Sequence, residues 1–168
     1  MNNEFNFGPA AEDDLIVFGA RRPEGLPSDV TRWIAFVRKQ GIQSVVCLLS
    51  GNGFGDKVIA NLLDVYEEEF GDDRVLHAPI VDYRLANRTT IKAILNFLAA
   101  SEHEQEKVVV HCSAGMGRTG QVLACWLVVG RNFEPLDAIK EVRRMGRSPT
   151  ESRSNLMPLL EYCRDLRV

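Results

Sequence analysis

The sequence lacks several features that would assign a protein to a class at once. None of its apolar runs reaches the roughly 18 residues that a membrane-spanning helix requires. Its first residues, MNNEFNFGPAAEDDL, include acidic residues and lack the basic and then apolar order of a secretory signal peptide. We therefore expect a cytoplasmic protein that does not bind membranes.

Cysteine is sparse, and its spacing is uninformative for metal binding. The four cysteines are far apart and form no C-x-x-C pair: Cys47, Cys112, Cys125 and Cys163. This pattern indicates neither a disulfide framework nor a zinc site, so we expect free thiols, no metal and no cofactor.

No excess of charge directs the chain to a polyanion. The 20 basic and 23 acidic residues give a net charge of -3, which provides no general attraction for nucleic acid. Any affinity for phosphate must therefore be local. The 168 residues suit a monomer with one domain over residues 14–168, preceded by a polar, flexible N-terminal arm over residues 1–13.

Hydrophobic patterns predict an alternation of strands and helices. Apolar, β-branched runs predict strands at residues 15–19, 42–49, 74–80 and 108–111. Apolar stripes at helical spacing predict helices at residues 28–41, 56–70, 89–101, 118–130, 136–145 and 154–166. This order predicts an α/β fold of three layers (αβα), with a central, mainly parallel sheet flanked by helices and a ligand site at the carboxyl ends of the strands.

The most informative stretch joins the strand KVVVHC to the helical segment QVLACWLVVG through the loop SAGMGRTG. Cys112 and Arg118 bracket five small or flexible residues, Ser113, Ala114, Gly115, Met116 and Gly117. Such a loop can curl with its amide N–H groups inward, and the helix that follows adds a positive dipole end. Amides, dipole and guanidinium together can bind a phosphate, and the same field favours the thiolate form of Cys112.

The segment from His111 to Gly120 resembles the H-C-x5-R-[ST]-G signature of the cysteine-dependent protein tyrosine phosphatase superfamily. The resemblance implies that Cys112 is the nucleophile, that residues 113–117 and Arg118 bind phosphate, and that the hydroxyl of Thr119 assists release of phosphate from cysteine. Thr119 could equally cap the helix. His111 lies on the strand, where alternation turns it away from Cys112, so we expect a buried histidine that braces the loop.

A phosphatase also needs a proton donor for the leaving oxygen. In the dual-specificity branch of the superfamily the general acid is on a movable loop one strand and one helix upstream, which implies Asp82 in the context Pro79-Ile80-Val81-Asp82. The residues alone leave Asp56, Asp72 and Asp73 as loop carboxylates too, although Asp72 and Asp73 precede a strand and would lie at its wrong end. Asp82 could also be a loop cap.

The short chain lacks room for the phosphotyrosine-clamping segment of the larger tyrosine phosphatases, so it resembles the dual-specificity branch more closely. Within that branch, Val46-Cys47 at the end of a strand and the later segment from Asn61 to Tyr66 are similar to the kinase-associated phosphatase. The uncharged Ser113, Ala114 and Met116 favour a singly phosphorylated protein side chain over an inositol lipid. Four arginines either ring the pocket and favour acidic peptides or are scattered on the surface: Arg84, Arg88, Arg147 and Arg153.

Cys47 has two interpretations. In related phosphatases a cysteine at this position can form a disulfide with the nucleophile and protect it from over-oxidation, whereas a small buried residue in a strand is the simpler alternative.

Two other functions use a similar loop. An RNA 5′-triphosphatase has a more basic setting and often lacks the acid, and a non-catalytic phosphate-binding module typically loses the cysteine or the arginine. The sequence keeps Cys112, Arg118 and Asp82 and is acidic overall, which argues against both alternatives. It favours hydrolysis of phosphotyrosine, with phosphoserine and phosphothreonine as further candidate substrates.

Overall fold

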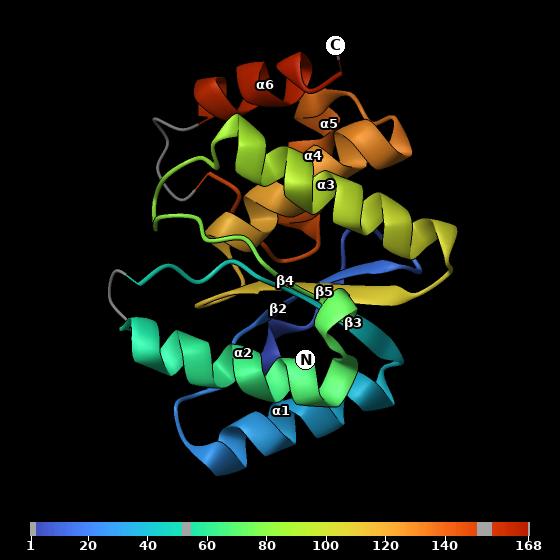
Figure 1. The fold of residues 1–168 in the computed structure, drawn as a ribbon. Helices are drawn as coiled ribbons and strands as arrows, with labels where there is room; N and C mark the ends of the chain where they lie inside the picture. The colour runs from blue at the N-terminus through green and yellow to red at the C-terminus, as the bar shows by residue number, and fades with distance from the viewer. Residues whose placement is uncertain (1–2, 52–54, 151–155, 168) are drawn as a thin grey trace.

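The fold is a sheet covered by helices on both faces, as seen in the computed structural model, which describes residues 3–51, 55–150 and 156–167. Helices α1 and α2 lie on one side of the sheet, and α3, α4, α5 and α6 lie on the other (Figure 1). The predicted three-layer α/β fold is therefore confirmed.

The sheet has the order β1-β2-β5-β3-β4. Its strands are β1 (Gly8–Pro9), β2 (Val17–Arg21), β3 (Ile42–Cys47), β4 (Val75–His77) and β5 (Lys107–Cys112). All neighbours are parallel except β1, which pairs antiparallel with β2. The central strand β5 is buried on both faces, which explains its unbroken run of Val108, Val109 and Val110.

The helices lie where the apolar stripes predicted them. They are α1 (Pro27–Lys39), α2 (Asp56–Phe70), α3 (Arg88–His103), α4 (Gly117–Arg131), α5 (Pro135–Arg144) and α6 (Leu156–Asp165). The described residues also form the short 3-10 turns η1 (Glu4–Asn6) and η2 (Asp72–Arg74). Helix α4 is buried for most of its length because it lies between the sheet and the outer helices, so its sequence is apolar all round rather than striped.

The predicted strand at residues 74–80 is too long, since β4 ends at His77. The chain nevertheless stays beside β3, because the amide of Ala78 donates to the carbonyl of Cys47 (3.0 Å) and that of Ile80 donates to the carbonyl of Leu48 (3.1 Å). These bonds carry the following segment along the sheet to the carboxyl end of β5.

The prediction of a flexible arm over residues 1–13 is wrong for residues 3–13. Phe5 is buried and packs edge-on against Phe36, and Phe7 stacks on Phe18 with ring centroids 5.1 Å apart. Strand β1 adds an edge to the sheet. The segment is polar in composition, but its two aromatic residues, Phe5 and Phe7, bury enough surface to order it.

None of the described helices combines the length and the hydrophobicity of a membrane-spanning segment. Within the same residues, no cluster of three or more histidine, cysteine, aspartate or glutamate side chains is arranged to hold a metal ion.

Candidate active site

The signature loop connects the end of β5 to the start of α4, at the carboxyl edge of the parallel strands. Gly115 makes its curvature possible, because its φ of +71° is unfavourable for other residues. A Cβ atom at this position would also lie 2.5 Å from the carbonyl of Ala20 on β2. The loop therefore needs glycine both for its conformation and for its close approach to the sheet.

The carbonyl groups of the loop are held from outside. The amide of Arg22 donates to the carbonyls of Cys112 (3.1 Å) and Ser113 (3.2 Å). The side-chain amide of Asn6 donates to the carbonyls of Ala114 and Gly115, both at 3.3 Å.

The carbonyl of Met116 completes the set, because it accepts from the amides of Gly120 (3.0 Å) and Ser148 (3.3 Å). In a trans peptide the carbonyl and the following N–H point in opposite directions. Outward carbonyls therefore leave the loop amides directed to the concave side, as a phosphate cradle requires.

Arg147 has a role that the sequence did not predict, because it supports the phosphate loop from inside the fold. It neither rings the pocket nor lies on the surface, because it is only 4% exposed. Its guanidinium donates to the carbonyl of Gly115 in the loop, to that of Gly19 on β2 (2.8 Å) and to that of Asn6 (2.9 Å). Burial lowers the pKa of Arg147 to about 10, so it remains a cation at neutral pH.

The sequence carried a weak signal for this contact at Gly19. A Cβ atom there would lie 2.8 Å from the guanidinium carbon of Arg147 and 2.9 Å from the methyl group of Thr119. A glycine inside a strand often marks such an approach, but it does not name the partner.

The other arginines have different surroundings. Arg88 is exposed and forms an ion pair with Asp165 at 2.7 Å, and Arg84 is exposed. Arg153 lies outside the described residues. Arg88 and Arg147 therefore do not form part of the predicted arginine ring around the pocket.

Arg118 is the second residue of α4, and its side chain is almost wholly buried. Its Nη1 atom donates to the carbonyl of Ile80 at 3.1 Å, and its Nε atom lies 3.3 Å from a carboxylate oxygen of Asp82. Arg118 thus joins the helix that follows the loop to the connection between β4 and α3.

Four aspartates were candidates for the proton donor: Asp56, Asp72, Asp73 and Asp82. Among the contacts of the described residues, only Asp82 reaches the signature loop or Arg118. Its side chain is about half exposed (48%) and accepts a bond from the amide of Tyr83, whose φ of +59° is unusual for a non-glycine residue. Asp72 and Asp73 precede β4 and so lie near the opposite edge of the sheet, and Asp56 begins α2.

Thr119 is the third residue of α4 and is fully buried. Met116, not Thr119, is the N-cap residue, so the interpretation of Thr119 as a helix cap is wrong. Its hydroxyl has no hydrogen-bond partner among the residues that the structure describes. The structure therefore shows no bond from this hydroxyl to the sulfur of Cys112, and such a bond stays a prediction. A buried hydroxyl without a partner costs free energy unless a bound group satisfies it.

His111 is buried on the face of the sheet covered by α1 and α2, as predicted, and its ring packs against Trp33 and Tyr66. Its Nδ1 atom lies 3.2 Å from the carbonyl of Cys112, and its Nε2 atom lies 3.1 Å from the hydroxyl of Tyr66. Because a carbonyl can only accept, Nδ1 carries the proton and Nε2 accepts from Tyr66. Burial lowers the pKa of His111 to about 4, which keeps it neutral.

Cys47 lies opposite His111 in the β3–β5 pair, one position from Cys112. Strand spacing and rise place the Cα atoms of Cys47 and Cys112 about 6 Å apart, which suits a disulfide. Successive residues of a strand face opposite sides, however, so a bond requires Cys112 to rotate. Burial raises the pKa of the Cys47 thiol to about 12, so this thiol is protonated at neutral pH.

The site thus combines four parts. They are a loop whose amides can bind an anion, the thiol of Cys112 where that loop begins, the buried guanidinium of Arg118 and the neighbouring carboxylate of Asp82. The fold and this arrangement define a phosphoric monoester hydrolase of the cysteine-based protein tyrosine phosphatase superfamily. The model of the family described as polymorphic toxin system, DSP-PTPase phosphatase, matches residues 19–131. The match covers more than half of the chain, so the chain belongs to this family.

Individual relatives agree with this assignment. The chain is 34% identical over 85 residues to protein tyrosine phosphatase domain-containing protein 1 of Danio rerio, an alignment that covers 51% of this chain and 12% of the relative. The chain therefore spans only a small part of that curated relative. The crystal structure of Tk-PTP in its active form is similar with a TM-score of 0.74 and 27% identity, and the alignment covers 94% of this chain and 97% of the other.

The predicted likeness to the kinase-associated phosphatase is found in the fold. A crystal structure of that protein, with its catalytic-site cysteine replaced by serine, has a TM-score of 0.74. The identity is 22%, and the alignment covers 89% of this chain and 86% of the other. At that identity the likeness concerns the architecture.

Proposed function

We propose that the chain hydrolyses phosphotyrosine, and also phosphoserine or phosphothreonine, in proteins through a cysteinyl-phosphate intermediate. The 3.3 Å approach of Asp82 to Arg118 is the observation that carries the proposal. It brings a carboxyl group beside the guanidinium that would hold the phosphate, which is where a proton donor for the leaving oxygen is required.

In the first step the thiolate of Cys112 attacks phosphorus. The sulfur–phosphorus bond forms as the bond from phosphorus to the side-chain oxygen breaks, and Asp82 gives its proton to that oxygen. Arg118 and the loop amides hold the equatorial phosphate oxygens, whose charge is spread in the transition state. The planar fork of an arginine suits two oxygens better than the point charge of a lysine.

In the second step water attacks the cysteinyl phosphate. The Asp82 carboxylate takes a proton from the water, the sulfur–phosphorus bond breaks, and inorganic phosphate leaves. The sulfur regains its electron pair, and the buried hydroxyl of Thr119 donates a hydrogen bond to it. His111 acts through the loop, because it donates to the carbonyl of Cys112 and does not contact substrate.

The residues of the loop support a singly phosphorylated substrate. Ser113, Ala114 and Met116 carry no charge that would compensate additional phosphates on an inositol ring. A phosphorylated protein side chain brings one dianionic group, which the loop amides, the dipole of α4 and Arg118 can neutralise.

Phosphate release from a phosphotyrosine peptide and from a small aryl phosphate, in the presence of a chelator, tests the proposal. We expect turnover of both by the wild-type protein and none by Cys112→Ser, which should still bind the phosphopeptide. Intact mass spectrometry of Asp82→Asn after rapid acid quenching should detect a phosphorylated Cys112. Turnover by Cys112→Ser at the wild-type rate would disprove the covalent mechanism.

A further inference from the structure

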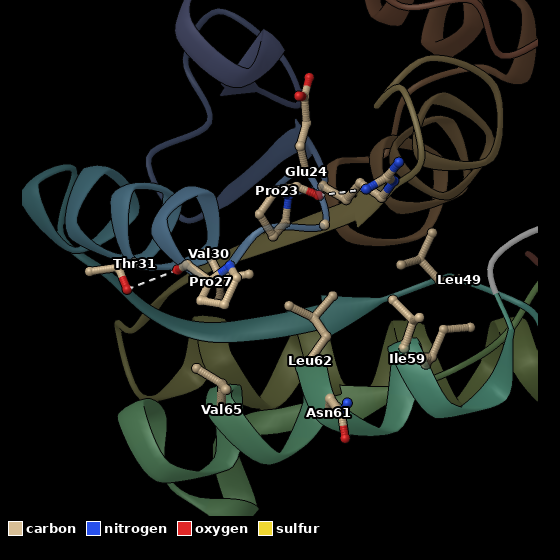
Figure 2. A pocket seen from close by; sticks show the side chains of 13 residues that line it. Pro23, Glu24, Pro27, Val30, Thr31, Leu49, Ile59, Asn61, Leu62 and Val65 are labelled. Carbon is tan, nitrogen blue, oxygen red and sulfur yellow. Dashed lines mark hydrogen bonds between the residues drawn. The ribbon is translucent and has the colours of Figure 1, made fainter.

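A pocket with a volume of about 340 Å³ lies between helix α2 and the connection that leads from β2 into α1 (Figure 2). Ile59 and Leu62 extend from α2 towards this connection, and Val30 and Leu49 contribute further walls. The carboxylate of Glu24 points away from the aliphatic side chains. The pocket therefore offers mainly hydrocarbon to a ligand.

The pocket is linked to the phosphate loop. A shallow hollow of about 330 Å³ is lined by Ser113 and Ala114 of the loop and by Arg21, Arg22 and Glu24. Arg22 and Glu24 also line the apolar pocket, so the two depressions share a wall. The backbone amide of Arg22 donates to the carbonyls of Cys112 and Ser113, which fixes the shared wall to the loop.

The size and chemistry of the pocket indicate its occupant. A volume of about 340 Å³ is near the lower limit of ligand pockets, which measure roughly 300–1,000 Å³, and suits one large apolar side chain with its backbone. The hydroxyl of Thr31 in the wall already donates to the carbonyl of Pro27 at 3.0 Å. The polar ends of Glu24 and Asn61 also point away from the aliphatic side chains (Figure 2), so selection here would depend mainly on apolar contact and shape.

A peptide suits the path between the loop and the pocket better than a phosphorylated lipid. The hollow carries both signs of charge, because Arg21 and Glu24 approach to 3.6 Å. The lining of two arginines, Arg21 and Arg22, and one carboxylate, Glu24, is compatible with a peptide backbone and its mixed side-chain charges, but it leaves little excess positive charge for a polyanionic headgroup. Extended peptides are recognised in this way, with side-chain pockets beside the main-chain path.

We infer that this pocket receives an apolar side chain that is close in sequence to the phosphorylated residue of a protein substrate. The inference rests on the proposed phosphatase function and adds a substrate class to it: phosphoproteins with a leucine-sized or aromatic residue near the phosphorylation site.

Phosphotyrosine peptides that carry a single leucine or phenylalanine, placed in turn at each position on both sides of the phosphotyrosine, test the inference. The reference peptide has serine at the same positions, and a small aryl phosphate reports the basal activity. We expect one position at which the apolar residue raises kcat/KM by about 10-fold or more over serine, a factor typical of burying a few methylene groups.

Two variants of α2 form a matched pair. Leu62 lines the pocket, whereas Leu63 is a similarly half-buried leucine that does not. Leu62→Gln should lose the preference for the apolar peptide and keep the wild-type rate on the aryl phosphate. Leu63→Gln should keep both. If Leu62→Gln does not fold, Val58→Asp at the exposed rim of the same pocket should also abolish the preference.

The outcomes separate the two proposals. Turnover of the aryl phosphate with equal kcat/KM for all peptides, or a preference that survives both Leu62→Gln and Val58→Asp, would overturn the inference and leave the phosphatase function intact. A preference for a short-chain phosphatidylinositol phosphate that Leu62→Gln abolishes would assign the pocket to an acyl chain and overturn the peptide. No turnover of any phosphate monoester would overturn both proposals.

Discussion

The Nε atom of Arg118 lies 3.3 Å from a carboxylate oxygen of Asp82, although 35 residues separate them in the sequence. The contact joins the helix after the phosphate loop to the connection after β4. A phosphate held by Arg118 would therefore lie close to the carboxyl group of Asp82.

Replacement of Asp82 by asparagine removes the proposed proton donor and keeps the shape of the side chain. We expect kcat for a phosphotyrosine peptide to fall by about 100-fold, and to fall less for an aryl phosphate with an acidic leaving group, which needs no proton. Steady-state kinetics on both substrates would measure the difference. Asp56→Asn at the start of α2 is the control, and an equal loss in the two variants would argue against Asp82.

Replacement of Arg147 by methionine leaves the carbonyls of Gly115 and Gly19 without their buried donor. We expect a loss of roughly 2–4 kcal/mol in the free energy of unfolding and weaker binding of inorganic phosphate. Arg147→Lys should restore part of both, because a lysine can reach fewer carbonyls. Denaturant unfolding and calorimetry would measure the effects, with exposed Arg144→Met as the control. Wild-type phosphate affinity in Arg147→Met would contradict the role assigned to Arg147.

Gly115→Ala should distort the phosphate loop for two reasons. The new methyl group would collide with the backbone of Ala20, and the φ of +71° at position 115 is unfavourable for alanine. We expect turnover of an aryl phosphate to fall by at least about 100-fold, since small errors in the position of the reacting groups are costly. Gly25→Ala is the control, because nothing lies within 4 Å of a Cβ atom there. A fully active Gly115→Ala would show that the loop tolerates another backbone path.

His111 should make the stability of the fold depend on pH. Its pKa is lowered from the ordinary 6.5 to about 4, so the unfolded chain binds a proton in this window that the folded chain does not. Stability should therefore fall as the pH drops from 6.5 to 4, by roughly 3 kcal/mol from this group. Between pH 6.5 and 4 the unfolding free energy of the wild type should fall by roughly 3 kcal/mol more than that of His111→Asn. Parallel curves would refute the assignment of the neutral histidine.

Mild peroxide treatment should join Cys47 to Cys112 if Cys47 protects the nucleophile. The protonated, buried Cys47 is a poor target for peroxide, so oxidation should begin at Cys112 and the thiol of Cys47 should then displace water from the sulfenic acid. Peptide mapping would detect the crosslink, and Cys47→Ala should lose activity irreversibly where the wild type recovers with a thiol reductant. Recovery of both proteins to the same extent would leave Cys47 as a packing residue.

Much of the site could be predicted because its chemistry is local in the sequence. Cys112, the flexible residues and Arg118 lie on consecutive positions, and alternation along β5 was enough to turn His111 away from Cys112 and into the core. Asp82 came mainly from resemblance, because the residues alone also offered Asp56. The order of the elements already indicated that Asp72 and Asp73 lie at the wrong end of their strand, but the contact of Asp82 with Arg118 depends on the tertiary structure.

The contacts of Arg147 and Asn6 with the phosphate loop could not be predicted from the sequence. Each donates to carbonyls of the phosphate loop from more than 30 residues away, and neither belongs to a periodic pattern or motif. The N-terminal segment reads as polar because its aromatic residues are few, although Phe5 and Phe7 hold it against the sheet.

The sequence alone determined the order of strands and helices and the anion-binding loop, because hydrophobic periodicity and backbone permissiveness act between neighbours. Only the tertiary structure decided which distant groups support that loop and which carboxylate approaches it. Those contacts depend on sheet order and on buried donors finding acceptors, and no spacing along a chain specifies either.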